Sequence, residues 1–148
     1  MSCDANKILV RRVFDEIASG GDFTVVEEIY AADYVDHAPF PGAPAGRGAV
    51  RHSIGALRTA MPDLHVTMEA MSAHGDKVAT HNTWRGTHTG EVLGIVPTGR
   101  VLTFSGVVVF RVSAGQIAER WAIGMDLDLL RELGLSLRWR PPRTAAAR

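Results

Sequence analysis

Residues 81–134 decide the fold, because four runs of different character follow one another there: HNTWR (81–85), FSGVVVFR (104–111), GQIAERW (115–121) and DLDLLRELG (126–134). The first three have the composition of β-strands. The run Val107–Phe110 is apolar at every position, which is typical of a strand buried on both faces. The fourth run has helical spacing and stops at Gly134, a common residue just after a helix. The stretch therefore predicts a sheet followed by a short last helix over 126–133.

The N-terminal part of the chain is helical in pattern. Three segments carry apolar residues at helical spacing: residues 6–19, a segment that begins at Asp22, and residues 47–60. Strand patterns follow at 64–71 and 77–85, joined by a Gly75-Asp76 turn. Helices followed by strands indicate the α+β class. We predict a curved antiparallel sheet that forms a cone or barrel, with three N-terminal helices packed over an apolar cavity.

Length and charge limit the possible functions. The 148 residues suit one domain over 1–134, followed by a basic tail over 135–148 that we expect to be disordered. Lys and Arg number 16 and Asp and Glu 16, so a nucleic-acid partner is not expected. The chain has no run long enough to span a membrane and no apolar leader, so we expect no membrane partner and a cytoplasmic location.

Self-association is favoured by two features of the sequence. The absence of net charge removes one barrier to association between copies. The doubly apolar run Val107–Phe110 needs a cover on its second face. We therefore predict a homodimer formed through the outer face of the sheet.

Familiar cofactor and nucleophile motifs are absent. The sequence has no G-x-S-x-G, no P-loop and no G-x-G-x-x-G, and Cys3 is its only cysteine. None of the six histidines pairs with another at i,i+4 spacing, so no metal site is expected. This leaves cofactor-free acid/base chemistry in an apolar cavity, where burial raises the pKa of a carboxyl group toward neutrality.

Five short stretches carry a family resemblance: DYVDH (33–37), MPDL (61–64), GDKV (75–78), RGTHTGE (85–91) and PTGR (97–100). With the strand order above, they make residues 6–134 similar to the SnoaL-like polyketide cyclases of the nuclear-transport-factor-like α+β cone superfamily. The resemblance implies an enzyme of antibiotic biosynthesis that enolises a hydrophobic aromatic polyketide and closes a ring by intramolecular aldol condensation.

The resemblance fails at the acid of those cyclases. Aligned on Trp121 and the last helix, Met125 stands where relatives carry an Asp, and Asp126 follows it. An aliphatic residue of Val107–Val109 stands where ring-closing relatives carry a His. Either a bulge returns Asp126 to the cavity, or Asp126 is the N-cap of the last helix.

Candidate site residues follow from these patterns. The acid/base candidates are Asp126 and His81, and the candidates for substrate binding are Tyr34, His37, Trp84, Arg85, Val107, Val109, Trp121 and Met125. His81 and Arg85 share one strand face, which lines either the cavity or an outer surface. Trp84 and Trp121 serve as core residues, as ligand stackers or as both.

Three functions remain open. The first is cyclisation, aldol or isomerisation chemistry on an aromatic polyketide without a cofactor. The second is assistance to hydroxylation of anthracycline-type polyketides, which would need a reductase partner or a reduced quinone substrate. The third is a non-catalytic module that binds a small hydrophobic molecule or a protein partner.

Overall fold

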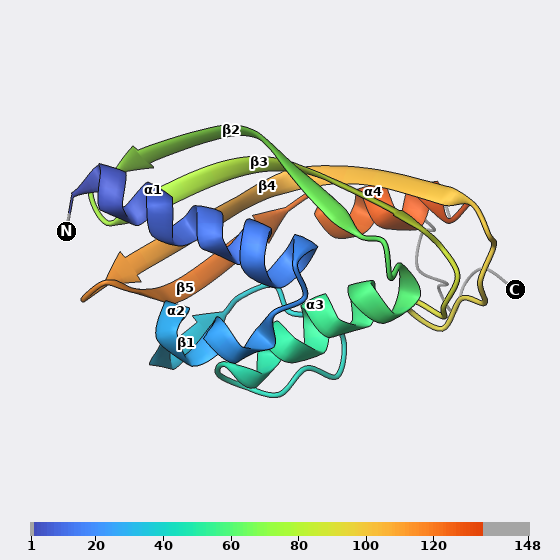
Figure 1. Ribbon diagram of the computed structural model, residues 1–148, viewed down its shortest axis with the longest axis horizontal. Coiled ribbons are helices and arrows are strands. Elements are labelled where there is room, and N and C mark those ends of the chain that lie inside the picture. The colour runs from blue at the N-terminus through green and yellow to red at the C-terminus, as the bar shows by residue number, and fades with distance from the viewer. Residues whose placement is uncertain (1, 135–148) are drawn as a thin grey trace, which may run out of the picture.

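The computed structural model describes residues 2–134, which form one five-stranded sheet with helices against its concave side (Figure 1). The helical elements are α1 (Cys3–Arg12), the π-helical η1 (Val13–Ser19), the 3-10 turn η2 (Phe23–Val25), α2 (Val26–Ile29), α3 (Gly48–Ala60) and α4 (Met125–Glu132). The strands are β1 (Tyr30–Asp36), β2 (His65–His74), β3 (Lys77–Thr87), β4 (Val101–Ser113) and β5 (Gln116–Ile123). Figure 1 shows β2, β3 and β4 arching over α1 and α3, while α4 lies against β4.

The predicted α+β class is confirmed, with one correction to the sheet. The strand order is β1-β5-β4-β3-β2, and β2 to β5 pair antiparallel as predicted. β1, however, pairs with β5 in parallel, so the sheet is mixed. Its edge strands β1 and β2 do not pair with each other, so the curved sheet stays open instead of closing into a barrel. A parallel pair needs a long connection, and here α3 and three strands supply it.

Side chains alternate strictly between the two faces of β3 and β4. On β3 the even-numbered residues Val78 to Trp84 are buried, and the odd-numbered residues face outward. On β4, Val108 and Phe110 are buried, but Val107 is 37% exposed. The apolar run is therefore buried on only one face within a single chain.

A bulge in β2 changes which of its side chains face the core. The pairing with β3 steps from Met68 directly to Ala70, so Glu69 is an extra residue. Beyond it Met71 packs against the core and Ala70 is exposed. A regular two-residue alternation from Leu64 would give the reverse for these two residues. An inserted residue leaves no trace in so short an alternating pattern.

The last helix begins one residue earlier than predicted. Gly124, with φ +83°, is the N-cap residue, so Asp126 lies within the first turn of α4 and not at the cap position. Gly134 follows the helix at φ +85°, as predicted. The predicted basic tail, residues 135–148, lies outside the described residues.

A buried imidazole holds the connection from β3 to β4. His88 is fully buried, and its Nδ1 accepts a hydrogen bond from the Thr98 backbone N–H at 3.2 Å. The His88 backbone N–H donates to the Arg100 carbonyl at 2.8 Å, and the Gly99 N–H returns a bond to the His88 carbonyl at 2.9 Å. These bonds fix the glycine-rich loop 88–100 between β3 and β4.

Arg58 of α3 ties that helix to the end of η1. Its Nη1 donates hydrogen bonds of 2.8 and 2.9 Å to the carbonyls of Ala18 and Ser19. Gly21, at φ +69°, makes room for the guanidinium, since a Cβ there would lie 2.7 Å from Arg58 Nε. The contact satisfies carbonyls that a helix end leaves without intrahelical partners.

Replacing Arg58 by Met should therefore lower the free energy of unfolding by about 1.5–3 kcal/mol, the usual contribution of hydrogen bonds to a charged group. Urea unfolding followed by circular dichroism measures this. Arg47→Met, at the N-terminal end of α3, is the matched control and should change stability by less than about 0.5 kcal/mol. Equal losses in both variants would mean that the Arg58 contacts add nothing.

Candidate active site

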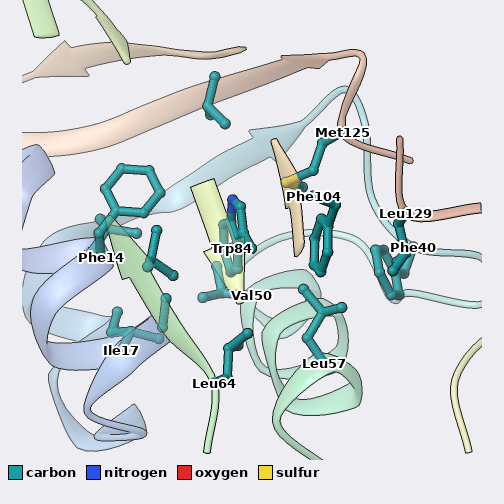
Figure 2. Close-up of a cluster of buried hydrophobic side chains, with 14 of the residues drawn as sticks. Phe14, Ile17, Phe40, Val50, Leu57, Leu64, Trp84, Phe104, Met125 and Leu129 are labelled. Carbon is teal, nitrogen blue, oxygen red and sulfur yellow. The ribbon is translucent and has the colours of Figure 1, made fainter. Parts of the chain in front are cut away.

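A small apolar cavity lies between the concave face of the sheet and α3. Its free space is about 30 Å³, room for about two water molecules. Figure 2 shows the side chains packed in this part of the core, with Trp84 among Phe14, Phe104 and Val50. The wall is formed by Val13, Phe14, Tyr30, Tyr34, Asp36, Ala38, Phe40, Ala49, Val50, Ser53, Ile54, Leu57, Trp84, Val108, Phe110, Arg120 and Met125. The side chains that line the cavity thus leave little free space inside it.

One ion pair stands in this apolar wall. Asp36 and Arg120 are direct partners in the parallel β1–β5 register, so their side chains leave the sheet on the same face. Arg120 Nη1 donates to Asp36 Oδ1 at 3.0 Å and to Oδ2 at 3.3 Å. The Asp36 side chain is 5% exposed and that of Arg120 is 15% exposed. Asp36 is the only carboxylate among the described residues that line the cavity.

The turn after β1 holds this ion pair in place. The Ala38 backbone N–H donates to Asp36 Oδ1 at 2.9 Å, and the Ala38 carbonyl accepts from Arg120 Nη1 at 3.2 Å. Oδ1 thus receives two hydrogen bonds and Oδ2 one. Oδ2 keeps more of its lone-pair capacity for a proton or a ligand.

Two tyrosines of β1 stand beside the pair. The rings of Tyr30 and Tyr34 meet edge to face, with centroids 4.7 Å apart. Burial raises the pKa of both hydroxyls well above the ordinary range, and the nearby Asp36 carboxylate adds to the effect. Both groups therefore stay protonated at physiological pH and act as hydrogen-bond donors.

The residues predicted for the site are divided between the two faces of the sheet. Three of them line the cavity: Tyr34, Trp84 and Met125. Five lie on the outer face: His81, Arg85, Val107, Val109 and Trp121. The cause is the two-residue period of a strand, because a candidate with the wrong parity points away from the cavity. Val108 and Phe110 reach the cavity in place of the two predicted valines.

His37 also lies on the outer face, pointing away from its neighbour Asp36. Its ring stacks on Trp121, with centroids 4.9 Å apart and planes 10° apart. Its Nε2 lies 3.3 Å from Glu119 Oε1, and Arg111 Nε donates to Glu119 Oε2 at 2.6 Å. The bonds from Arg111 and then from His37 lower the pKa of the Glu119 carboxyl. His37 therefore belongs to a surface cluster and does not line the cavity.

Met125 fills the position where the resemblance led us to expect an acid. It is buried against Gly106 of β4, where an added Cβ would lie 2.8 Å from both the Met125 backbone N and its Cβ. Only glycine permits this close approach of β4 and α4. Asp126 is next in the chain, in the first turn of α4, and its role as an acid stays a prediction.

Sequence reasoning missed Asp36, Arg120 and Phe40 as site residues. A charged residue in the middle of an apolar strand was the available signal for Arg120. Its partner Asp36, however, is 84 positions away in the sequence. Phe40 lies in a Pro/Gly-rich connection, where a side chain buried in the cavity is unexpected.

Metal ligands do not gather in the described part of the chain. Among residues 2–134, no three His, Cys, Asp or Glu side chains lie close enough to share a metal ion. None of the helices in this part is long and apolar enough to cross a bilayer.

Comparisons with known proteins show what the chain resembles. A family model described as SnoaL-like polyketide cyclase matches residues 8–133. IdmH of Streptomyces antibioticus, a proposed polyketide cyclase, has a TM-score of 0.74 and 29% identity, over 88% of this chain and 99% of its own. AclR of Streptomyces galilaeus, a proposed hydroxylase, has a TM-score of 0.76 and 25% identity, over 90% and 98%.

A third structure supports the fold alone. TsrD of Streptomyces laurentii has a TM-score of 0.81 at 23% identity, over 90% of this chain and 98% of its own. No curated protein sequence matches the chain.

Phe40 limits the volume of the cavity. Its side chain is 6% exposed, and its backbone N–H donates to Ser53 Oγ at 3.1 Å. We expect Phe40→Ala to open a dry apolar cavity, to destabilise the protein by about 3–5 kcal/mol, and to bind benzene. Benzene should then raise the melting temperature of the variant more than that of the wild type.

Val96→Ala, at an exposed loop position, is the control and should behave as the wild type. If benzene stabilised the wild type and Phe40→Ala equally, Phe40 would not limit the cavity.

Proposed function

The chain belongs to the SnoaL-like polyketide cyclase family, and we propose that its cavity performs cofactor-independent acid/base chemistry on a hydrophobic aromatic polyketide. The reaction would be of the cyclisation, aldol or isomerisation type. The observation that carries the proposal is the Asp36 carboxylate, which is held by Arg120 in an otherwise apolar wall. The likeness to IdmH, a proposed polyketide cyclase, supports the substrate class.

In this proposal Asp36 is the general base. Oδ2, which carries a single hydrogen bond, takes a proton from a carbon next to a carbonyl of the substrate. The electron pair that is released forms an enolate, whose negative charge is stabilised by the hydroxyl of Tyr34 and the guanidinium of Arg120. Asp36 then returns the proton to the product. The step balances without an oxidant or a reductant.

In this proposal Asp36 supplies the acid/base group that Met125 cannot supply. Met125 has no ionisable group, and the roles predicted for Asp126 and His81 are untested. The His81 side chain is exposed on the outer face of β3, opposite the buried Asn82. Asp36 already lines the cavity and therefore needs no rearrangement of the sheet.

The cavity must open before a polycyclic substrate enters. Its free space of about 30 Å³ is far smaller than the 300 Å³ or more usual for ligand pockets. The connection from β1 to α3, residues 37–47, forms part of the wall through Ala38 and Phe40. We place the entrance at residues 39–47 of this connection, because they make no backbone hydrogen bond to a strand.

A hydroxylation role is the second candidate. Two observations favour it: Met125 at the family's acid position, and the likeness to AclR, a proposed hydroxylase, at 25% identity. Such a reaction needs dioxygen. It also needs electrons, which a reductase partner or a reduced quinone substrate would supply.

We further propose that two copies associate through the outer face of the sheet. Val107 and Ile123 pair across β4 and β5 on this face, and Ile123 is 67% exposed. Trp121 and Val109, the adjacent outward pair, extend the apolar area. Burial of this face would provide the cover that the apolar run of β4 lacks within one chain.

Asp36→Asn tests the proposed base. We expect a loss of about 10²–10⁴ in rate, because Asn keeps the size and the hydrogen-bond acceptor but cannot take the proton. The measurement is chromatographic detection of the cyclised isomer, or mass-spectrometric detection of deuterium uptake from D₂O, with a panel of aromatic polyketide β-ketoesters. Asp33→Asn, an exposed position on the same strand, is the control.

Thermal unfolding of Asp36→Asn checks that the variant is folded. Full activity of this variant would refute Asp36 as base. Turnover that depends on dioxygen and a reductant would favour the hydroxylation role. Ligand binding without turnover in the wild type would favour the non-catalytic module.

Ile123→Lys tests the proposed dimer. A charge placed on the outer face should shift the protein from dimer to monomer in analytical ultracentrifugation, because the partner's apolar surface would have to desolvate it. Val96→Lys, at an exposed loop position, should leave the oligomeric state unchanged. A wild type that sediments as a monomer would contradict the proposal.

A further inference from the structure

Two buried hydrogen-bonding groups of the cavity wall have no partner. Within residues 2–134, five buried side-chain polar atoms lack a hydrogen bond, and two of them, Tyr34 Oη and Trp84 Nε1, belong to residues of the wall. Leaving a polar group unpaired in the interior costs about 1–3 kcal/mol. Such groups are rare in folded proteins, and each one calls for a physical explanation.

Both groups are donors. The indole N–H of Trp84 can only donate. The hydroxyl of Tyr34 stays protonated, because burial raises its pKa well above the ordinary range. The one carboxylate of the described wall, on Asp36, is already engaged by Arg120 and by the Ala38 N–H. The two unpartnered groups of the described wall are therefore both donors.

Packing holds both donors in position. The Trp84 ring lies between Phe14, at 6.1 Å and 77°, and Phe104, at 6.1 Å and 12°. Figure 2 shows its ring nitrogen on the side away from Leu64. Tyr34 is held by its edge-to-face contact with Tyr30. Neither ring needs to reorient to meet a ligand, which lowers the entropy cost of binding.

We propose that Tyr34 Oη and Trp84 Nε1 receive acceptor oxygens of the ligand, so that the cavity selects oxygenated rings, carbonyl or enolate in form, over hydrocarbons of the same shape. Trp84 thereby becomes a specificity-determining residue and not only a core residue. The inference rests on the proposed function in so far as the ligand enters this cavity, but it does not depend on Asp36 being the base.

A matched pair of probes tests it. Acetophenone and ethylbenzene have nearly the same shape, and only acetophenone carries an acceptor oxygen. In ¹H–¹⁵N spectra of the full chain, the Trp84 indole signal is the one that Trp84→Phe removes. We expect acetophenone to move this signal downfield and ethylbenzene to leave it nearly in place, because a new hydrogen bond deshields the indole proton.

Affinities of the variants complete the test. Tyr34→Phe removes only the hydroxyl and should weaken acetophenone binding about threefold to tenfold, the equivalent of one net hydrogen bond. Its affinity for ethylbenzene should stay within about twofold of the wild type on the same grounds. Because Tyr34 Oη makes no hydrogen bond and only lies near the Asp36 carboxylate, the variant should keep the stability of the wild type to within about 1 kcal/mol in the absence of ligand.

The outcomes separate this inference from the proposed function. An unmoved indole signal at saturating acetophenone, equal shifts with both probes, or no binding of acetophenone would each overturn the donor proposal. Loss of turnover in Asp36→Asn together with an unmoved indole signal would support Asp36 as the base and refute the donor pair. Full turnover in Asp36→Asn together with a shifted indole signal would refute Asp36 as the base and support the donor pair.

Discussion

The ion pair of Asp36 and Arg120 is the constraint on which the site depends. It joins β1 to β5, the one parallel pair of the sheet, and Arg120 also binds the Ala38 carbonyl at the first turn of the connection to α3. A buried ion pair of this kind adds little to the net folding stability, because both charges must be desolvated. Loss of one partner, by contrast, costs about 3–5 kcal/mol, since the other charge is left buried alone. The pair therefore specifies a local geometry more than it stabilises the fold.

Strand parity organises the rest of the molecule. On β3 and β4 the even-numbered side chains face the core, and the odd-numbered ones belong to an outer face where Trp121 of β5 stacks on His37. Two irregularities adjust this rule: the extra residue Glu69 in β2 and a register shift in β5 after Ile117. Because of the second, both Ile117 and Arg120 reach the inner side of β5. A regular strand would have placed one of them outside.

The cavity combines tight packing with unpaired polar groups. Its free space is about 30 Å³, yet Tyr34 Oη and Trp84 Nε1 remain without partners beside a buried ion pair. A wall selected for stability alone would carry apolar groups of the same shape at these positions. A few oriented polar groups in a mostly apolar wall are typical of sites that bind small molecules.

The sequence by itself determined the class of fold, the helices and hairpins, and the family. These depend on local periodicity, on turn residues such as Gly75-Asp76 and Gly134, and on short sequence motifs. It also identified Tyr34, Trp84 and Met125, which line the cavity.

Only the tertiary structure decided that Asp36 faces Arg120, that His81 and Arg85 lie outside, and that β1 runs parallel to β5. The physical reason is that a strand reverses its faces with every residue. A bulge of one residue, or a partner 84 positions away, changes what meets the cavity without changing the local pattern.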